Sequence, residues 1–110
     1  RDWPSKIEKI IERHPSIVKC CVTGVKVNEH DNGEIPTAFI VLDKNAGDVQ
    51  TIVDEVNDSC LKELPERDIA LQYVVKEDLP LTPVGKIDYR KLSKDGVMDM
   101  ETKKLILAKK

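Results

Sequence analysis

The side chains of this 110-residue chain that could do chemistry are two histidines, three cysteines and one glycine–lysine pair. Cys20 and Cys21 are adjacent, so on a strand they point to opposite faces, and no Cys-x-x-Cys or His-x-x-x-His spacing occurs. We therefore predict no metal site, and we expect Cys20 and Cys60 to be small core residues. Nucleophilic catalysis needs a base held beside a thiol or hydroxyl, and the sequence does not show that His14 or His30 approaches one.

The pair Gly85-Lys86 is typical of phosphate-binding loops. Such a loop would also need glycine where Pro80 stands and serine or threonine where Ile87 stands. The segment is therefore not a P-loop, and on composition alone Lys86 would be one more solvated surface lysine.

The amino-terminal half has the patterns of one helix and two strands. Ser5 followed by Glu8 fits a capping box, and isoleucines three and four residues apart predict a helix over residues 5–13. Apolar and β-branched residues predict strands over 17–27 and 37–42. We expect these two strands to pair antiparallel, with the second buried on both faces.

The carboxy-terminal half predicts a longer helix, a third strand and a proline-rich connection. Apolar residues at helical spacing cover 48–64, with Asp48 as the cap, and a strand follows at 71–75. The helix suits a crossover back onto the sheet. Residues 77–87 read as a loop, and a short helix is expected over 88–96.

These elements predict an α+β fold with a small three-stranded sheet packed with helices. We expect one domain over residues 1–96 and a weakly patterned tail over 97–110. Eighteen basic and twenty acidic residues give a net charge of −2, which predicts neither a nucleic-acid nor a membrane-surface partner. No apolar run reaches the roughly 18–20 residues of a membrane span, and the three cysteines favour reduced thiols in the cytoplasm.

Residues 78–92 read Asp-Leu-Pro-Leu-Thr-Pro-Val-Gly-Lys-Ile-Asp-Tyr-Arg-Lys-Leu. This stretch closely resembles the final motif of the adenylate-forming, AMP-binding enzymes, which include acyl-CoA synthetases, peptide-synthetase adenylation domains and luciferases. Residues 4–8, 14–18 and 33–41 also look like that family's carboxy-terminal subdomain, in the same order. The resemblance covers about residues 3–95, and it is greatest to acyl-CoA synthetases.

The resemblance implies a catalytic role for Lys86. In such enzymes a carboxylate joins the α-phosphate of ATP and pyrophosphate leaves, and a lysine ammonium can bridge the two anions in the transition state. The resemblance further implies that Gly85 lets the backbone approach the ligand, while Pro80 and Pro83 stiffen the loop. Family members commonly have arginine where Tyr89 stands, so a contact made by that arginine does not carry over.

The resemblance also implies a larger enzyme. We expect this chain to be a fragment whose large amino-terminal adenylation domain binds ATP and the carboxylic acid, with Mg²⁺ and CoA used by the whole enzyme. The small domain would rotate to serve adenylation and then attack by a thiol, that of CoA or of a carrier protein. The isolated fragment is expected to be inactive and to hold no cofactor. The alternative is a stand-alone docking or binding module that partners a separate adenylation chain.

Overall fold

The computed structural model describes residues 3–25, 34–66, 69, 72–94 and 106–107. Within these ranges the elements follow one another as α1 (Trp3–Glu12), β1 (Ile17–Val25), β2 (Ile35–Leu42), α2 (Val49–Glu63), β3 (Gln72–Lys76) and β4 (Ile106–Leu107). Among the described residues, no helix is both long and apolar enough to pass through a membrane.

The strands form one mixed sheet in the order β1-β2-β3-β4. β1 pairs antiparallel with β2, as predicted, and β2 pairs parallel with β3. A parallel pair needs a crossover connection, and α2 supplies it. The predicted α+β fold with three strands and packed helices is therefore confirmed. The two-residue β4, which comes from the expected tail, adds a fourth strand antiparallel to β3.

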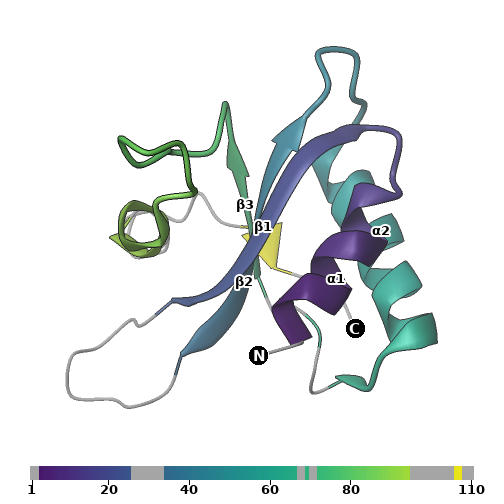
Figure 1. Ribbon diagram of the computed structural model, residues 1–110. Helices are drawn as coiled ribbons and strands as arrows, with labels where there is room; N and C mark the ends of the chain where they lie inside the picture. Colours follow the sequence, from purple (N-terminus) through teal and green to yellow (C-terminus); the bar gives the residue numbers. More distant parts are fainter. Residues whose placement is uncertain (1–2, 26–33, 67–68, 70–71, 95–105, 108–110) are drawn as a thin grey trace.

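One face of the sheet is covered by α1 and α2, which lie next to each other in Figure 1. Asp48 caps α2 as predicted, because its carboxylate accepts the Thr51 backbone N–H at 3.0 Å. The helices pack onto the sheet through a main core. Its members include buried residues of both helices and of three strands: Ile7, Ile10, Ile11, Ile17, Cys20, Val22, Ala38, Ile40, Ile52, Val53, Val56, Cys60 and Tyr73.

The predicted capping box is wrong. α1 begins at Trp3, two residues before Ser5, so Ser5 lies inside the helix. The Glu8 carboxylate instead accepts the backbone N–H of Val22 at 2.7 Å. Since β1 is an edge strand, a backbone N–H on its outer side has no strand to pair with, and the Glu8 side chain satisfies it.

The other face of the sheet carries a second, smaller core. As predicted, β2 is buried on both faces, since residues 37–41 are all buried. Figure 1 shows what covers this face: the segment after β3 folds over it, on the side opposite α1 and α2. The second core contains Cys21, Val25, Phe39, Val41, Val74, Leu79 and Leu92. Leu79 and Leu92 flank Gly85 and Lys86 in the sequence, so this core fixes to the sheet the segment that carries them.

Candidate active site

The segment after β3 folds back on itself as a small hairpin over residues 80–88. Leu81 and Ile87 form an antiparallel bridge across it. At the base of the hairpin, the Asp88 backbone N–H donates to the Pro80 carbonyl at 2.9 Å. The hairpin is thus a closed unit, and along the chain it lies between β3 and a helical turn.

The tip of the hairpin is a tight turn that needs glycine. The Gly85 N–H donates to the Thr82 carbonyl at 2.9 Å, and the Thr82 N–H donates to the Lys86 carbonyl at 2.6 Å. Gly85 has a φ of +86°, which is the left-handed residue of a three-residue hairpin loop. The expected irregular loop over 77–87 is therefore a hydrogen-bonded hairpin in the structure. The left-handed turn is itself a reason for glycine at this position.

Lys86 lies at the tip of this hairpin, directly after the turn, and its side chain is exposed. Two apolar side chains of the hairpin are exposed beside it, Leu81 at 62% and Val84 at 80%. The tip therefore presents one ammonium group together with apolar surface, and the structure leaves both accessible to a partner.

The base of the hairpin is tied to the sheet. Leu79 before it and Leu92 after it are buried in the second core, and Ile87 packs against that core. Asp78 adds a charged link, since its carboxylate accepts the Lys19 ammonium of β1 at 2.8 Å. This hydrogen bond lowers the pKa of Asp78 below its ordinary value. The tip is exposed, but its position is set by packing below it.

A helical turn over residues 89–94 follows the hairpin. It begins within one residue of the short helix predicted over 88–96, and residues 95–96 lie outside the described residues. Asp88 caps it, because its carboxylate accepts the Lys91 backbone N–H at 3.1 Å. The first residue of the turn is Tyr89, whose ring is half exposed. The pKa of Tyr89 is raised, chiefly by the charge that Cys21 of β1 would carry in its ionised form.

Cys20 and Cys60 are core residues, as predicted, and Cys21 is a core residue as well. All three cysteines are buried and free, with Cys20 and Cys21 on opposite faces of the sheet. Burial raises the pKa of Cys21 and of Cys60 to about 11, so these thiols stay protonated at neutral pH. In the part of the chain that the structure describes, no three potential metal ligands gather into a site.

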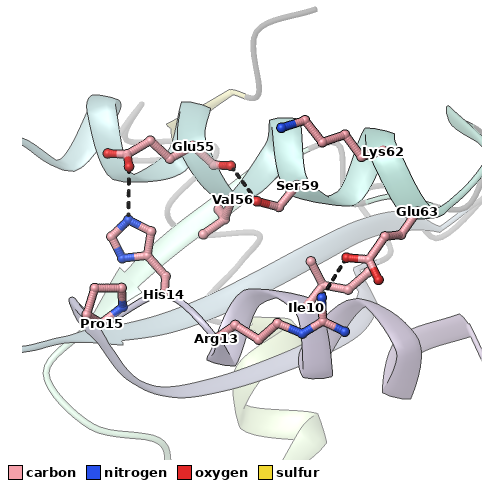
Figure 2. Close-up of a pocket in the computed structure, with 9 residues that line it drawn as sticks. All are labelled: Ile10, Arg13, His14, Pro15, Glu55, Val56, Ser59, Lys62 and Glu63. Carbon is pink, nitrogen blue, oxygen red and sulfur yellow. Dashed lines mark hydrogen bonds and ion pairs between the residues drawn. The ribbon is translucent and has the colours of Figure 1, made fainter.

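His14 lies in the helix layer, away from the hairpin. It follows the end of α1, its Nδ1 accepts the Ser16 backbone N–H at 3.1 Å, and its Nε2 lies 3.5 Å from the Glu55 carboxylate of α2. Figure 2 shows this His14–Glu55 contact on one side of a pocket, with the 2.6 Å Arg13–Glu63 ion pair on the other. The pocket, of about 300 Å³, is lined by Ile10, Arg13, His14, Pro15, Glu55, Val56, Ser59, Lys62 and Glu63. His30 lies outside the described residues.

Most of the fold and most of the hairpin lie within the match to a known protein family. Residues 6–86 match the profile of the family described as "AMP-binding enzyme C-terminal domain". The chain belongs to this family. The domain is thus identified over most of its length, from α1 to the lysine at the tip of the hairpin.

Named relatives agree with this assignment. The domain is 32% identical over 91 residues to the human protein called "Acetyl-coenzyme A synthetase 2-like, mitochondrial", a match that covers 82% of this chain and 13% of that protein. Among solved structures, it resembles an acyl-CoA synthetase from Brucella canis, with a TM-score of 0.70, 27% identity, and coverage of 88% of this chain and 18% of the other.

A second structure is the fatty acyl CoA synthetase of Mycobacterium tuberculosis, with a TM-score of 0.67, 28% identity, and coverage of 86% and 18%. The domain therefore spans less than a fifth of the length of the proteins it matches. The family of adenylate-forming ligases is established, and other matched members of it have been solved with ATP bound.

Sequence reasoning named Lys86 and Gly85, and the structure places both at the tip of the hairpin. It missed the hydrogen bond between Lys19 and Asp78 at the base of the hairpin, which joins residues 59 positions apart. No local pattern signals this contact, because it depends on how the segment after β3 lies against β1.

Proposed function

We propose that the domain is the mobile carboxy-terminal subdomain of an ATP-dependent carboxylate ligase, an acyl-CoA synthetase, and that it delivers Lys86 for formation of the acyl-adenylate. The observation that carries this proposal is the placement of Lys86, exposed at the tip of a hairpin whose base is fixed in a core. The names of its relatives support the reaction class.

A cation suits the first half-reaction. A carboxylate oxygen forms a bond to the α-phosphorus of ATP while the bond from that phosphorus to pyrophosphate breaks. Two anions must approach, so the negative charge between them is greatest in the transition state. A lysine ammonium that touches both sets of oxygens stabilises this arrangement more than the separated reactants.

In bulk water, the Lys86 ammonium would stabilise this transition state only weakly. At 4 Å, two unit charges interact by about 1 kcal/mol in bulk water and about 4 kcal/mol at an effective dielectric constant near 20. The exposed Lys86 therefore needs a second surface that excludes water around it. The apolar Leu81 and Val84 beside it are suited to burial against such a surface, which we assign to the large adenylation domain of the same protein.

The remaining parts of the proposal follow from the family. The large domain would bind ATP, with its Mg²⁺, and the carboxylic acid, and the small domain would reorient so that the thiol of CoA attacks the acyl-adenylate. We propose residues 1–96 as the subdomain and 97–110 as a tail that returns to the sheet edge through β4. We also propose the cytoplasm as its compartment, although the named human relative is mitochondrial.

The test is the substitution Lys86→Ala in the full-length enzyme that carries this chain. Acyl-adenylate formation is followed by ATP–pyrophosphate exchange with a panel of carboxylic acids, beginning with acetate. We expect the exchange rate to fall by about 10²- to 10³-fold, the scale seen when one preorganised charge or donor is lost. Thioester formation from supplied acyl-adenylate should change much less, because only one orientation brings Lys86 to the phosphate.

Lys94→Ala is the matched control, since Lys94 is also exposed and lies eight residues further along the same segment. It should leave both half-reactions unchanged. Equal losses in both half-reactions for Lys86→Ala would contradict the proposal. An unchanged exchange rate would instead favour the alternative, a docking or binding module that uses the same exposed tip without taking part in the chemistry.

A further inference from the structure

The backbone of Lys86 is held by one residue on the other side of the turn, Thr82. The Thr82 N–H donates to the Lys86 carbonyl at 2.6 Å. The Lys86 N–H in turn donates to the Thr82 hydroxyl at 3.3 Å. The main chain and the side chain of Thr82 therefore bind the two polar backbone groups of the lysine on which the proposed function depends.

The Thr82 hydroxyl serves as the acceptor because of how the turn closes. In an antiparallel hydrogen-bonded pair, the two facing residues exchange two backbone hydrogen bonds. Here the Thr82 carbonyl accepts the Gly85 N–H at 2.9 Å, one residue before Lys86. This offset is the bulge that a left-handed residue makes at the end of a three-residue hairpin loop. The Lys86 N–H therefore takes the Thr82 hydroxyl in place of the carbonyl.

The bond to the hydroxyl fixes the peptide group between Gly85 and Lys86. Gly85 has no Cβ, and nothing lies within 4 Å of the position that a Cβ would occupy. Steric contacts therefore do little to limit rotation of the backbone at Gly85. Such a rotation would turn the Cα–Cβ bond of Lys86 and displace its exposed ammonium. The Thr82 hydroxyl opposes it, because a hydrogen bond is directional.

Thr82 is itself held in place. Its side chain is half-buried, and branching at its Cβ limits the rotamers of the hydroxyl. Pro83 follows it, and the residue before a proline favours extended backbone. On its other side, Leu81 forms the bridge to Ile87, which packs against the second core. A series of contacts thus leads from that core through the hairpin to the backbone of Lys86.

We propose that Thr82 is a positioning residue for Lys86, and that its hydroxyl fixes the orientation of the lysine backbone during acyl-adenylate formation. This inference rests on the proposed function, because it concerns the lysine assigned there. Placement matters at this level, since a displacement of about 1 Å can cost up to about 10²-fold in rate. Thr82 acts through Lys86, so the binding of ATP, which we assign to the large domain, does not depend on the hydroxyl.

The first experiment compares Thr82→Val and Thr82→Ser with the wild type in the full-length enzyme. Valine keeps the branched shape and the preference for extended backbone and removes only the hydroxyl, whereas serine keeps the hydroxyl. We expect Thr82→Val to slow adenylate formation by about 3- to 10-fold, the range of one net hydrogen bond, and Thr82→Ser to stay within about 2-fold of the wild type. The KM for ATP and the rate of thioester formation from supplied acyl-adenylate should stay unchanged in both.

Two further variants separate positioning from other roles. Thr23→Val makes the same substitution at a half-buried threonine of β1, away from the hairpin, and should leave both half-reactions unchanged. Thr82→Val combined with Lys86→Ala should be no slower than Lys86→Ala alone, because Thr82 acts only through the lysine. A further loss in the double variant would mean that Thr82 contacts the substrates itself, and the positioning role would be wrong.

The second experiment detects the hydrogen bond without activity. In the 110-residue chain, NMR follows the exchange of the Lys86 amide proton with water. Thr82→Val should speed this exchange by about 3- to 10-fold, and Thr82→Ser should leave it near the wild-type rate. The Asp88 amide, which donates to the Pro80 carbonyl at the base, should exchange at the same rate in all three proteins.

The contrary outcomes are distinguishable. If Lys86→Ala slows adenylation but Thr82→Val does not, the positioning role is wrong and the proposed function stands. If Thr82→Val slows both half-reactions equally, or speeds exchange at Asp88 as much as at Lys86, Thr82 acts in folding and not in positioning. Unchanged exchange at Lys86 after Thr82→Val would show that the hydroxyl does not hold the lysine. If Lys86→Ala leaves adenylation unchanged, the proposed function fails and this inference fails with it.

Discussion

The second core can be tested through Leu92, whose side chain is fully buried beneath the helical turn after the hairpin. Replacing a buried leucine by alanine costs about 2–5 kcal/mol. The second core has few members and lies against one sheet face, so it can partly collapse around the missing atoms. We therefore expect the lower part of that range, about 2–3 kcal/mol, for Leu92→Ala.

The loss should appear first in the hairpin. Hydrogen exchange measured by NMR reports on the amides of Asp88 and Thr82, whose N–H groups close the base and the tip. Their protection should fall by about 30- to 150-fold, which is 2–3 kcal/mol at about 1.4 kcal/mol per tenfold change. The amides of Phe39 and Ile40 in β2 should change less, because α1 and α2 still cover the main core.

Leu81→Ala is the control for this experiment, since it removes the same atoms from a leucine of the hairpin itself, at a side chain that is 62% exposed. It should change stability by no more than about 0.5 kcal/mol. Equal protection losses in the hairpin and in β2 after Leu92→Ala would show that the two cores unfold together. An effect of Leu81→Ala as large as that of Leu92→Ala would refute the assignment of Leu92 as the buried anchor.

Two other features give predictions of different kinds. In Gly24→Ala, the added Cβ would lie 2.9 Å from the Glu34 Cβ, so denaturant unfolding should show a loss of about 1–3 kcal/mol, whereas Gly47→Ala, with nothing within 4 Å, should show no steric loss. Lys19→Gln should raise the pKa of Asp78, measured by NMR titration, because the Lys19 bond lowers it. The stabilisation from this pair should be present above the ordinary aspartate pKa of about 3.9 and disappear as pH falls through the lower folded value. Lys19→Gln should weaken this acid-side dependence without removing it, because the Leu79 backbone N–H also donates to the Asp78 carboxylate.

Much of the fold could be predicted because its signals are local. The apolar stripe of α2, its Asp48 cap and the continuous apolar run of β2 each depend on neighbouring residues only, and each was found within a few positions. The role of Glu8 could not be predicted in this way. A glutamate three residues after a serine fits a capping box locally, but the unpaired N–H of Val22 on the sheet edge takes its carboxylate instead.

In the candidate site, too, some features have a local sequence signal and others do not. The motif around Lys86 was readable from the sequence, and the turn at its tip also had a signal, since Pro83 and Gly85 suit a type I turn closed by a left-handed glycine. The contacts that hold the site in place had no such signal. Asp78 and Lys19 are 59 positions apart in sequence, and only the three-dimensional arrangement of this segment beside β1 brings them together.

The local stability of the hairpin enters the proposed reaction directly. If Lys86 acts only while the hairpin is seated, the rate of adenylation scales with the fraction of molecules in which it is seated. That fraction is close to one while the seated state is favoured by a few kcal/mol, so small losses at the base are silent. A loss of about 2–3 kcal/mol at Leu92 would remove most of the free energy that favours the seated state. Adenylation would then fall together with the protection of the Asp88 amide.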